Sequence, residues 1–308
     1  MFSQPLLIAS RSARMRRAVT GTPALRRLAD RFVAGETLDQ AVASTTGLVD
    51  RGLHVTIDHL GEDTLDAADA AATRDAYLAL LGQLTDLGLS GQVEVSVKLS
   101  ALGQKLATDA EQVTLANAVA ICEAARVAGT TVTVDMEDHT TVDATLGTVR
   151  DLRGEYPWVG AVLQSCLRRT EADCADLSTA GSRVRLVKGA YAEPASVAHP
   201  AKRDVDLAYV RCMRTLMASK AYPMIATHDL RMVEIAESLG TELGREPGSY
   251  EFQMLYGIRA AEQRDLAARD HLVRVYLPYG EDWYGYFMRR LAERPANLAF
   301  FARSLFSR

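Results

Sequence analysis

The sequence predicts a single α/β domain that folds as a (β/α)8 barrel of the TIM type. Its 308 residues are 48% hydrophobic and 24% charged, so the chain can bury one large core. Short runs rich in Val and Ile alternate with segments of helical periodicity, which predicts parallel strands. About eight such alternations over roughly 230 residues match a closed barrel. An open doubly wound sheet is the alternative, but its G-x-G-x-x-G turn is absent.

The strand candidates are bounded by turn residues or by helical segments. They are residues 55–58, 93–100, 131–138, 159–165, 184–191, 223–229, 250–256 and 273–280. Between the second and third lies a predicted helix that ends at Gly129. The apolar face of this helix is predicted to consist of Val113, Ala116, Val119, Ala120 and Cys122 or Ala124.

Three segments make up the expected single functional domain. Residues 1–50 form an N-terminal helical segment, residues 51–294 form the catalytic barrel, and residues 295–308 form an amphipathic C-terminal helix. The basic N-terminal segment is either a solvated cap or a contact for anionic lipid. The apolar C-terminal stripe either packs on the barrel or meets a membrane. The residues behind these two readings are Arg11, Arg14, Arg16, Arg17, Arg26, Arg27, Arg31, Leu298, Phe300, Phe301 and Leu305.

Charge and cysteine content narrow the functional classes. The 35 basic and 39 acidic side chains give a net charge of -4, so no global field favours nucleic acid. The four cysteines form no C-x-x-C pair, which favours a reducing cytosol. The sequence has no run of about 18 apolar residues, so we expect a cytoplasmic protein that is soluble or peripheral at the inner face of the membrane.

Polar residues stand at the carboxyl end of almost every predicted strand, where a barrel places its active site. They are Asp58, His59, Lys98, Ser100, Asp135, Glu137, Gln164, Lys188, Tyr191, Thr227, His228, Gln253, Tyr256, Tyr276 and Tyr279.

Metal binding and Schiff-base chemistry are the first hypotheses for these residues. His54 and His59 lie about 16 Å apart at roughly 3.3 Å per residue, so they cannot share an ion, and we expect no metal site. A desolvated Lys98 or Lys188 could form a Schiff base as in an aldolase. Alternatively, Lys98 is a fixed charge beside an anionic ligand, and Lys188 belongs to a loop that approaches a phosphate or ribityl chain.

The segment after the last strand carries two adjacent arginines, Arg289 and Arg290, with Tyr286 one turn before and Glu293 one turn after. If the pair points into the barrel mouth, it would bind a carboxylate in a bidentate way. If the pair points outward, it is a solvated charge run.

Six motifs in order resemble the proline dehydrogenase family across most of the barrel. They are VSVKLSALG, RLVKGAYAEP, ATHDLR, YEFQMLYGI, VYLPYG and YGYFMRRLAER. The resemblance implies a distorted barrel with the last helix over the strand ends. It also implies non-covalent FAD, hydride transfer from L-proline to flavin N5, 1-pyrroline-5-carboxylate as product, and a membrane quinone as electron acceptor.

The resemblance also assigns the substrate site. Arg289 and Arg290 would clamp the proline carboxylate with Lys98 as a third cation, and Asp135 would orient that cationic group. Glu62 would act as an acidic gate paired with Arg289 over bound substrate. Residues that would wall the pyrrolidine ring or complete the motif are Tyr191, Leu255, Tyr276 and Glu293.

For the flavin, the resemblance places Arg185 near N5 and Gln164 at the polar edge of the ring. Ala192 stands where some relatives have an aromatic residue, so one flavin face should be less covered. The residues assigned to the ribityl chain, phosphates and adenosine are Val187, Gly189, Ala190, Lys202, Arg203, Thr227 and His228.

The family also implies how the product is used. The chain carries no second catalytic motif, so it should be monofunctional and hand its product to a separate pyrroline-5-carboxylate dehydrogenase. Two hypotheses from other classes remain at this point, a Schiff-base aldolase and a non-catalytic flavin-binding barrel.

Overall fold

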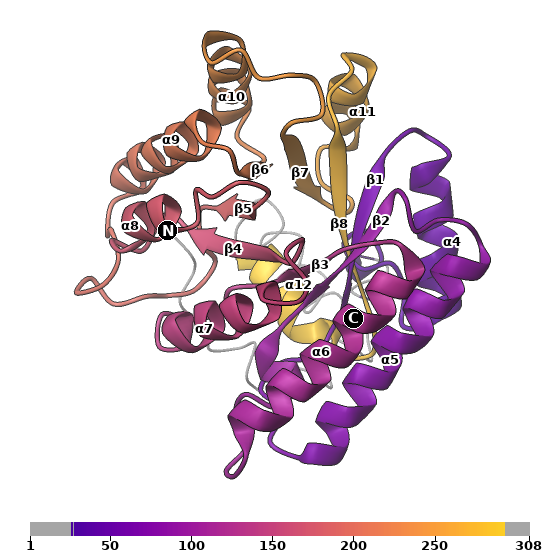
Figure 1. Cartoon of the computed structure of the whole chain (residues 1–308). Helices are drawn as coiled ribbons and strands as arrows, with labels where there is room; N and C mark the ends of the chain where they lie inside the picture. Colours follow the sequence, from indigo (N-terminus) through magenta and orange to yellow (C-terminus); the bar gives the residue numbers. More distant parts are fainter. Residues whose placement is uncertain (1–25, 27, 293–308) are drawn as a thin grey trace, which may run out of the picture.

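A computed structural model describes residue 26 and residues 28–292 of the chain. In this part, parallel strands close into a barrel in the order β1 to β8, and β8 pairs back with β1. The predicted TIM-type barrel is therefore confirmed (Figure 1). The strands are β1 (His54–His59), β2 (Val93–Val97), β3 (Val132–Val134), β4 (Gly160–Gln164), β5 (Arg183–Val187), β6 (Tyr222–Ala226), β7 (Glu251–Leu255) and β8 (Val273–Tyr279).

Helices cover the outside of this ring, and one helix lies near its middle in Figure 1. The outer helices are α4 (Leu38–Val49), α5 (Ala67–Asp86), α6 (Ala110–Ala128), α7 (Val142–Arg153), α8 (Thr170–Asp176), α9 (Lys202–Ala218), α10 (Leu230–Glu242) and α11 (Ala260–Ala268). The helix near the middle is α12 (Trp283–Ala292), drawn in yellow. A short 3-10 helix, η1 (Leu99–Leu102), follows β2.

Several predicted strands extended beyond the observed ones at their carboxyl ends. The predictions for 93–100 and 131–138 end in the structure at Val97 and Val134. Lys98 is the N-cap of η1, and Asp135 follows β3 in irregular backbone. Both residues therefore lie just beyond their strands at the barrel mouth, and Asp135 N still donates to the Val97 carbonyl at 2.8 Å.

The helix at 110–129 and its stop at Gly129 are present, but its predicted apolar face was only partly right: Cys122 is buried, whereas the other predicted positions are half-buried or exposed. Thr114 and Asn117 are buried on this helix: the Thr114 hydroxyl donates to the carbonyl of Ala110 at 2.6 Å, and the Asn117 amide donates to the carbonyl of Leu102 at 2.9 Å. Choosing the face by apolar residues alone overlooked polar side chains that find partners inside. The observed buried face is Thr114, Asn117, Ala118, Ile121, Cys122 and Ala125.

A second apolar cluster positions α12 at the barrel mouth. Phe287, Met288 and Leu291 of α12 are fully buried in it, together with Phe32 from the segment before α4. Gly257, with φ +71°, admits that segment closely, since a Cβ there would lie 1.5 Å from the carbonyl oxygen of Arg31. Packing of two segments from opposite ends of the described chain thus fixes where the helix lies.

The domain boundaries drawn from the sequence fall partly outside the described residues. Glu293 and the predicted helix at 295–308 lie outside them, as does most of the arginine-rich N-terminal segment. Among the helices that are described, none is long and apolar enough to cross a membrane.

Candidate active site

A cavity of about 260 Å3 opens at the carboxyl ends of the strands, beneath α12. Twelve of the residues assigned from the sequence line it. Both arginines of α12 are among them, so the pair points into the barrel mouth and not outward into solvent. The twelve are Lys98, Asp135, Gln164, Arg185, Val187, Gly189, Ala190, Tyr191, Leu255, Tyr276, Arg289 and Arg290.

Lys98 is a buried ammonium group held between carboxylates. Its Nζ donates to Asp58 Oδ2 at 2.6 Å and lies 3.5 Å from Asp135 Oδ2. Burial alone would lower the pKa of Lys98, but the carboxylates, Asp58 first, hold it well above its ordinary value. A lysine kept protonated in this way is a fixed positive charge and a poor nucleophile for a Schiff base.

Asp135 connects three polar groups on the cavity floor. Its Oδ1 accepts from Arg185 Nη1 at 2.7 Å, and its Oδ2 accepts from the Tyr276 hydroxyl at 2.7 Å. The Tyr276 hydroxyl in turn accepts from Lys98 at 3.3 Å. Desolvation by burial, followed by the Asp135 charge, raises the pKa of Tyr276 well above its ordinary value, so its hydroxyl stays a hydrogen-bond donor.

Arg289 forms the ion pair expected from the resemblance. Its Nη1 donates to Glu62 Oε2 at 2.9 Å, and its Nη2 contacts the other carboxylate oxygen of Glu62. Both side chains are largely buried. The Arg290 guanidinium lies over the Tyr286 ring, 5.2 Å from its centroid. The gate role of Glu62 remains a prediction, but the contact that it requires is formed.

The loop after β5 brings its backbone close to the cavity wall. Gly189 has φ +105°, and a Cβ there would lie 2.4 Å from Cys166 Sγ and 3.3 Å from Gln164 Oε1. Only glycine fits this position without moving its neighbours. Gln164 is fixed by donating to the Glu137 carbonyl at 2.7 Å.

Four residues assigned to the flavin phosphates or adenosine do not line this cavity. Lys202 and Arg203 are exposed in the first turn of α9, and Lys202 pairs with Asp206. Thr227 Oγ1 accepts from the backbone of Asp229, and His228 Nε2 accepts from Leu255 N at 3.0 Å. Their proposed contacts with the cofactor remain predictions.

Lys188 lines the cavity, but its ammonium group is engaged elsewhere. Its Nζ donates to Asp206 Oδ1 at 2.6 Å and to Asp229 Oδ2 at 3.0 Å. The side chain therefore links α9 to the N-cap of α10.

The sequence interpretation placed Asp58 and Gln253 at the barrel mouth without a specific role and did not name Ser96, and the structure brings all three to the centre of the site. Asp58 is the closer partner of Lys98, and Ser96 and Gln253 both bind Arg185. The alternation of side chains along a strand could have predicted two of these positions. Ser96 precedes Lys98 by two residues and Gln253 precedes Leu255 by two, so each shares the inward face with a residue assigned to the site.

No metal centre is evident in the part of the chain that the structure describes. Within residues 28–292, no group of three or more His, Cys, Asp or Glu side chains could hold an ion. Asp135, the one carboxylate among the described residues that line the cavity, is instead paired with Lys98 and Arg185.

Fold and site together define a (β/α)8 barrel enzyme whose cavity combines apolar walls with several cations. A family model described as proline dehydrogenase matches residues 41–303. The chain belongs to the proline dehydrogenase family, as the six motifs predicted, and is an enzyme of that family.

Individual relatives agree with this assignment. The chain is 42% identical to the proline dehydrogenase of Deinococcus radiodurans over 280 residues, 90% of each chain. It is 40% identical to proline dehydrogenase 2 of Bacillus subtilis over 272 residues, 88% of each chain. A crystal structure of proline utilization A from Bdellovibrio bacteriovorus, inactivated by N-propargylglycine, matches with a TM-score of 0.82 over 98% of this chain and 37% of that one. At 22% identity, this last match supports the fold alone.

Proposed function

We propose that this enzyme oxidises L-proline to 1-pyrroline-5-carboxylate, with non-covalent FAD as hydride acceptor at N5 and a membrane quinone as the final electron acceptor. The observation that carries the proposal is the inward placement of Arg289 and Arg290 over a cavity that also contains Lys98. Relatives that cover about 90% of the chain are named proline dehydrogenase.

The cation cluster suits an amino acid carboxylate. Guanidinium groups bind carboxylates through paired, charge-assisted hydrogen bonds that fix orientation as well as supplying attraction. Leu255, Tyr276 and Tyr191 offer apolar surface for a small saturated ring in the same cavity. Desolvation by burial raises the pKa of Tyr191 far above its ordinary value, so this wall carries no extra charge. Proline has both features, a carboxylate and a compact apolar ring.

The residues present fit a flavin. Gly189 lines the cavity with bare backbone, and its lack of a side chain lets this loop pack against Cys166 and Gln164, so the loop can present backbone groups to a ribityl chain. Arg185, Gln164 and the backbone near Val187 provide polar groups around the same space. When bound, FAD supplies the two-electron acceptor that no protein side chain offers.

The protein's own groups position the substrate and exclude water. The Arg289 and Glu62 pair lies at the cavity edge, so closing it over the substrate would keep solvent out. Lys98 stays charged beside Asp58 and Asp135 and so offers the substrate carboxylate a fixed cation. Holding the ring against Tyr276 would align its C–H bond for transfer, a positioning role.

Electron delivery to quinone requires contact with a membrane surface. The motivating features are the basic N-terminal segment, most of which lies outside the described residues, and the apolar stripe at 298–305, all of which does. We expect full-length protein to sediment with anionic vesicles and a doubly truncated form to sediment less. Equal sedimentation of the two would contradict this membrane contact. The product would pass to a separate pyrroline-5-carboxylate dehydrogenase.

The decisive experiment is anaerobic mixing of FAD-loaded protein with L-proline. Bleaching of the flavin absorbance, together with a pyrroline adduct trapped by aminobenzaldehyde, is the expected result. A bound flavin that proline leaves oxidised would overturn the substrate assignment and favour a non-catalytic flavin barrel. A borohydride-trapped lysine adduct in colourless protein would instead favour the Schiff-base aldolase, which the paired state of Lys98 and Lys188 disfavours.

A further inference from the structure

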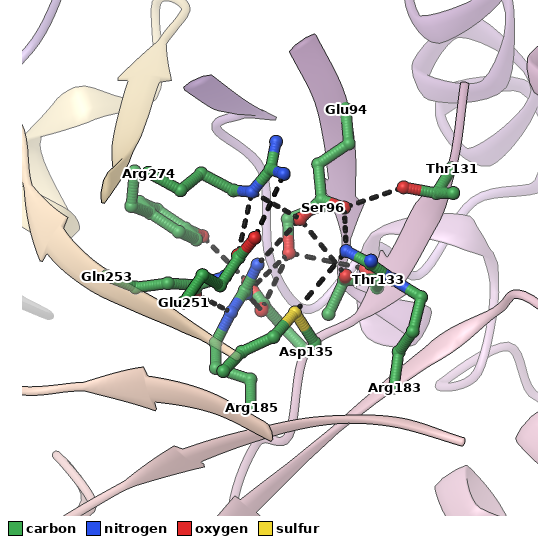
Figure 2. A network of polar contacts seen from close by, with 12 residues as sticks. Glu94, Ser96, Thr131, Thr133, Asp135, Arg183, Arg185, Glu251, Gln253 and Arg274 are labelled. Carbon is green, nitrogen blue, oxygen red and sulfur yellow. Dashed lines mark hydrogen bonds and ion pairs between the residues drawn. The ribbon is translucent and has the colours of Figure 1, made fainter. Parts of the chain in front are cut away.

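The guanidinium of Arg185 is held on three edges at the cavity floor (Figure 2). Its Nε donates to Gln253 Oε1 at 2.6 Å. Its Nη1 donates to Asp135 Oδ1 at 2.7 Å and to Ser96 Oγ at 2.9 Å. Its Nη2 lies 3.5 Å from Glu94 Oε1. A flexible side chain is thereby reduced to one orientation.

The amide of Gln253 is itself oriented from both ends. A guanidinium has only donors, so the amide turns its oxygen towards Arg185. Its nitrogen then faces Glu251, whose Oε1 accepts at 2.5 Å. Arg274 binds both oxygens of Glu251, at 2.8 and 3.1 Å, and the Tyr222 hydroxyl donates to Oε2 at 3.0 Å. A reversed amide would place donor against donor and acceptor against acceptor, so the chain of contacts has one direction.

We propose that Gln253 and Glu251 are positioning residues for Arg185, and that through it they set how strongly the site stabilises the reduced cofactor. The inference rests on the proposed function, which places Arg185 beside the flavin ring. Gln253 lines the cavity, whereas Glu251 is fully buried two residues earlier on β7. Glu251 therefore acts on the site only through its neighbours.

A purely structural role would not change the cofactor's redox equilibrium. A cation beside the ring favours the electron-rich reduced form, so a displaced Arg185 weakens binding of reduced FAD more than binding of oxidised FAD. The ratio of these two affinities fixes the reduction potential of the bound flavin. For a two-electron couple, a tenfold change in that ratio equals about 30 mV.

The test measures the reduction potential and the affinity for oxidised FAD in full-length holoenzyme. Gln253→Leu removes the acceptor at Arg185 Nε and keeps a similar volume. We expect the ratio of reduced to oxidised FAD affinity to fall at least about tenfold, hence a potential more negative by at least about 30 mV, with oxidised FAD affinity within about threefold of wild type. Glu251→Gln should shift the potential in the same direction by a smaller amount. The new amide can present either a donor or an acceptor to Gln253, so it fixes the Gln253 amide less firmly, and it does not itself line the cavity.

Two variants serve as matched controls. Tyr222→Phe removes one hydrogen bond from Glu251 but leaves the oxygen that Gln253 uses. Asn117→Leu removes a buried amide with two hydrogen bonds on α6, away from the cavity. Both should keep the wild-type potential even where they lower the melting temperature.

The outcomes separate this inference from the proposed function. An unchanged affinity ratio in folded Gln253→Leu overturns the positioning role, and so does a control that shifts the potential equally. If Gln253→Leu does not fold, Glu251→Gln decides by the same criterion. Failure of the wild type to bind FAD, or to be reduced by proline, would instead overturn the proposed function.

Discussion

Replacing Glu94 by glutamine removes one carboxylate from a cluster of three arginines inside the barrel (Figure 2). Its oxygens lie 2.7 Å from Arg183 Nη2, 3.5 Å from Arg185 Nη2 and 3.8 Å from Arg274 Nε. Burial alone would raise the pKa of Glu94, but the arginines, Arg274 first, lower it from 4.5 to about 2. At about 1.4 kcal/mol per pH unit, this difference stabilises the fold by about 3 kcal/mol at neutral pH.

The pH dependence of Glu94→Gln follows from the same pKa. Because the folded value is depressed, the stabilisation is fully present above pH 4.5 and is lost as the pH falls towards 2. Urea unfolding followed by circular dichroism, with FAD in excess, should show the variant about 3 kcal/mol less stable at pH 7. By pH 3 that gap should have fallen to less than half.

A surface carboxylate provides the control for Glu94→Gln. Glu242 pairs with Arg214 at 2.9 Å, and both side chains are about half exposed. Glu242→Gln should cost less than about 1 kcal/mol, because exposed ion pairs are screened by water. The reasoning would be refuted by a Glu94→Gln gap that is the same at pH 7 and pH 3, or by a loss no larger than the control's.

Two further substitutions test the site, and one labelling measurement tests its surroundings. Arg290→Met should weaken proline binding by about 2–4 kcal/mol through lost charge-assisted bonds while FAD affinity is retained; unchanged proline affinity in a titration would contradict the clamp. Glu62→Gln removes the charge opposite Arg289 and should raise KM for proline several-fold, about 1 kcal/mol, with kcat within about twofold; an unchanged KM would argue against a gate. Burial raises the pKa of Cys166 to about 11, so mass spectrometry at pH 8 should find it alkylated on the order of 100-fold more slowly than a free cysteine, and rapid labelling would show that this environment is wrong.

The barrel and the chemistry of its mouth were predictable from local patterns. Alternating strand and helix signals, with Gly129 closing one helix, are written in short stretches of sequence and depend little on distant residues. The motif with Arg289 and Arg290 is equally local. The resemblance of six ordered motifs then identified the family, which the family model over residues 41–303 confirms.

Side-chain contacts across the barrel could not be predicted from those local patterns. Asp58 and Lys98 lie 40 residues apart, and Arg185 and Gln253 lie 68 apart, yet each pair is in hydrogen-bond contact. The register between neighbouring strands decides which inward-facing side chains lie at the same height along the barrel axis. Backbone hydrogen bonds set that register. No single segment carries this information.

By itself, the sequence determined which segments form strands, which side chains can carry charge, and that two adjacent arginines follow the last strand. Only the tertiary structure decided that Arg289 and Arg290 face the cavity, because α12 is placed by packing against the segment that contains Phe32. It also decided that the inside of the barrel carries paired charges such as Glu94 with Arg183. A buried charge is tolerated only where closure of the fold supplies its partner, and that partner comes from a distant strand.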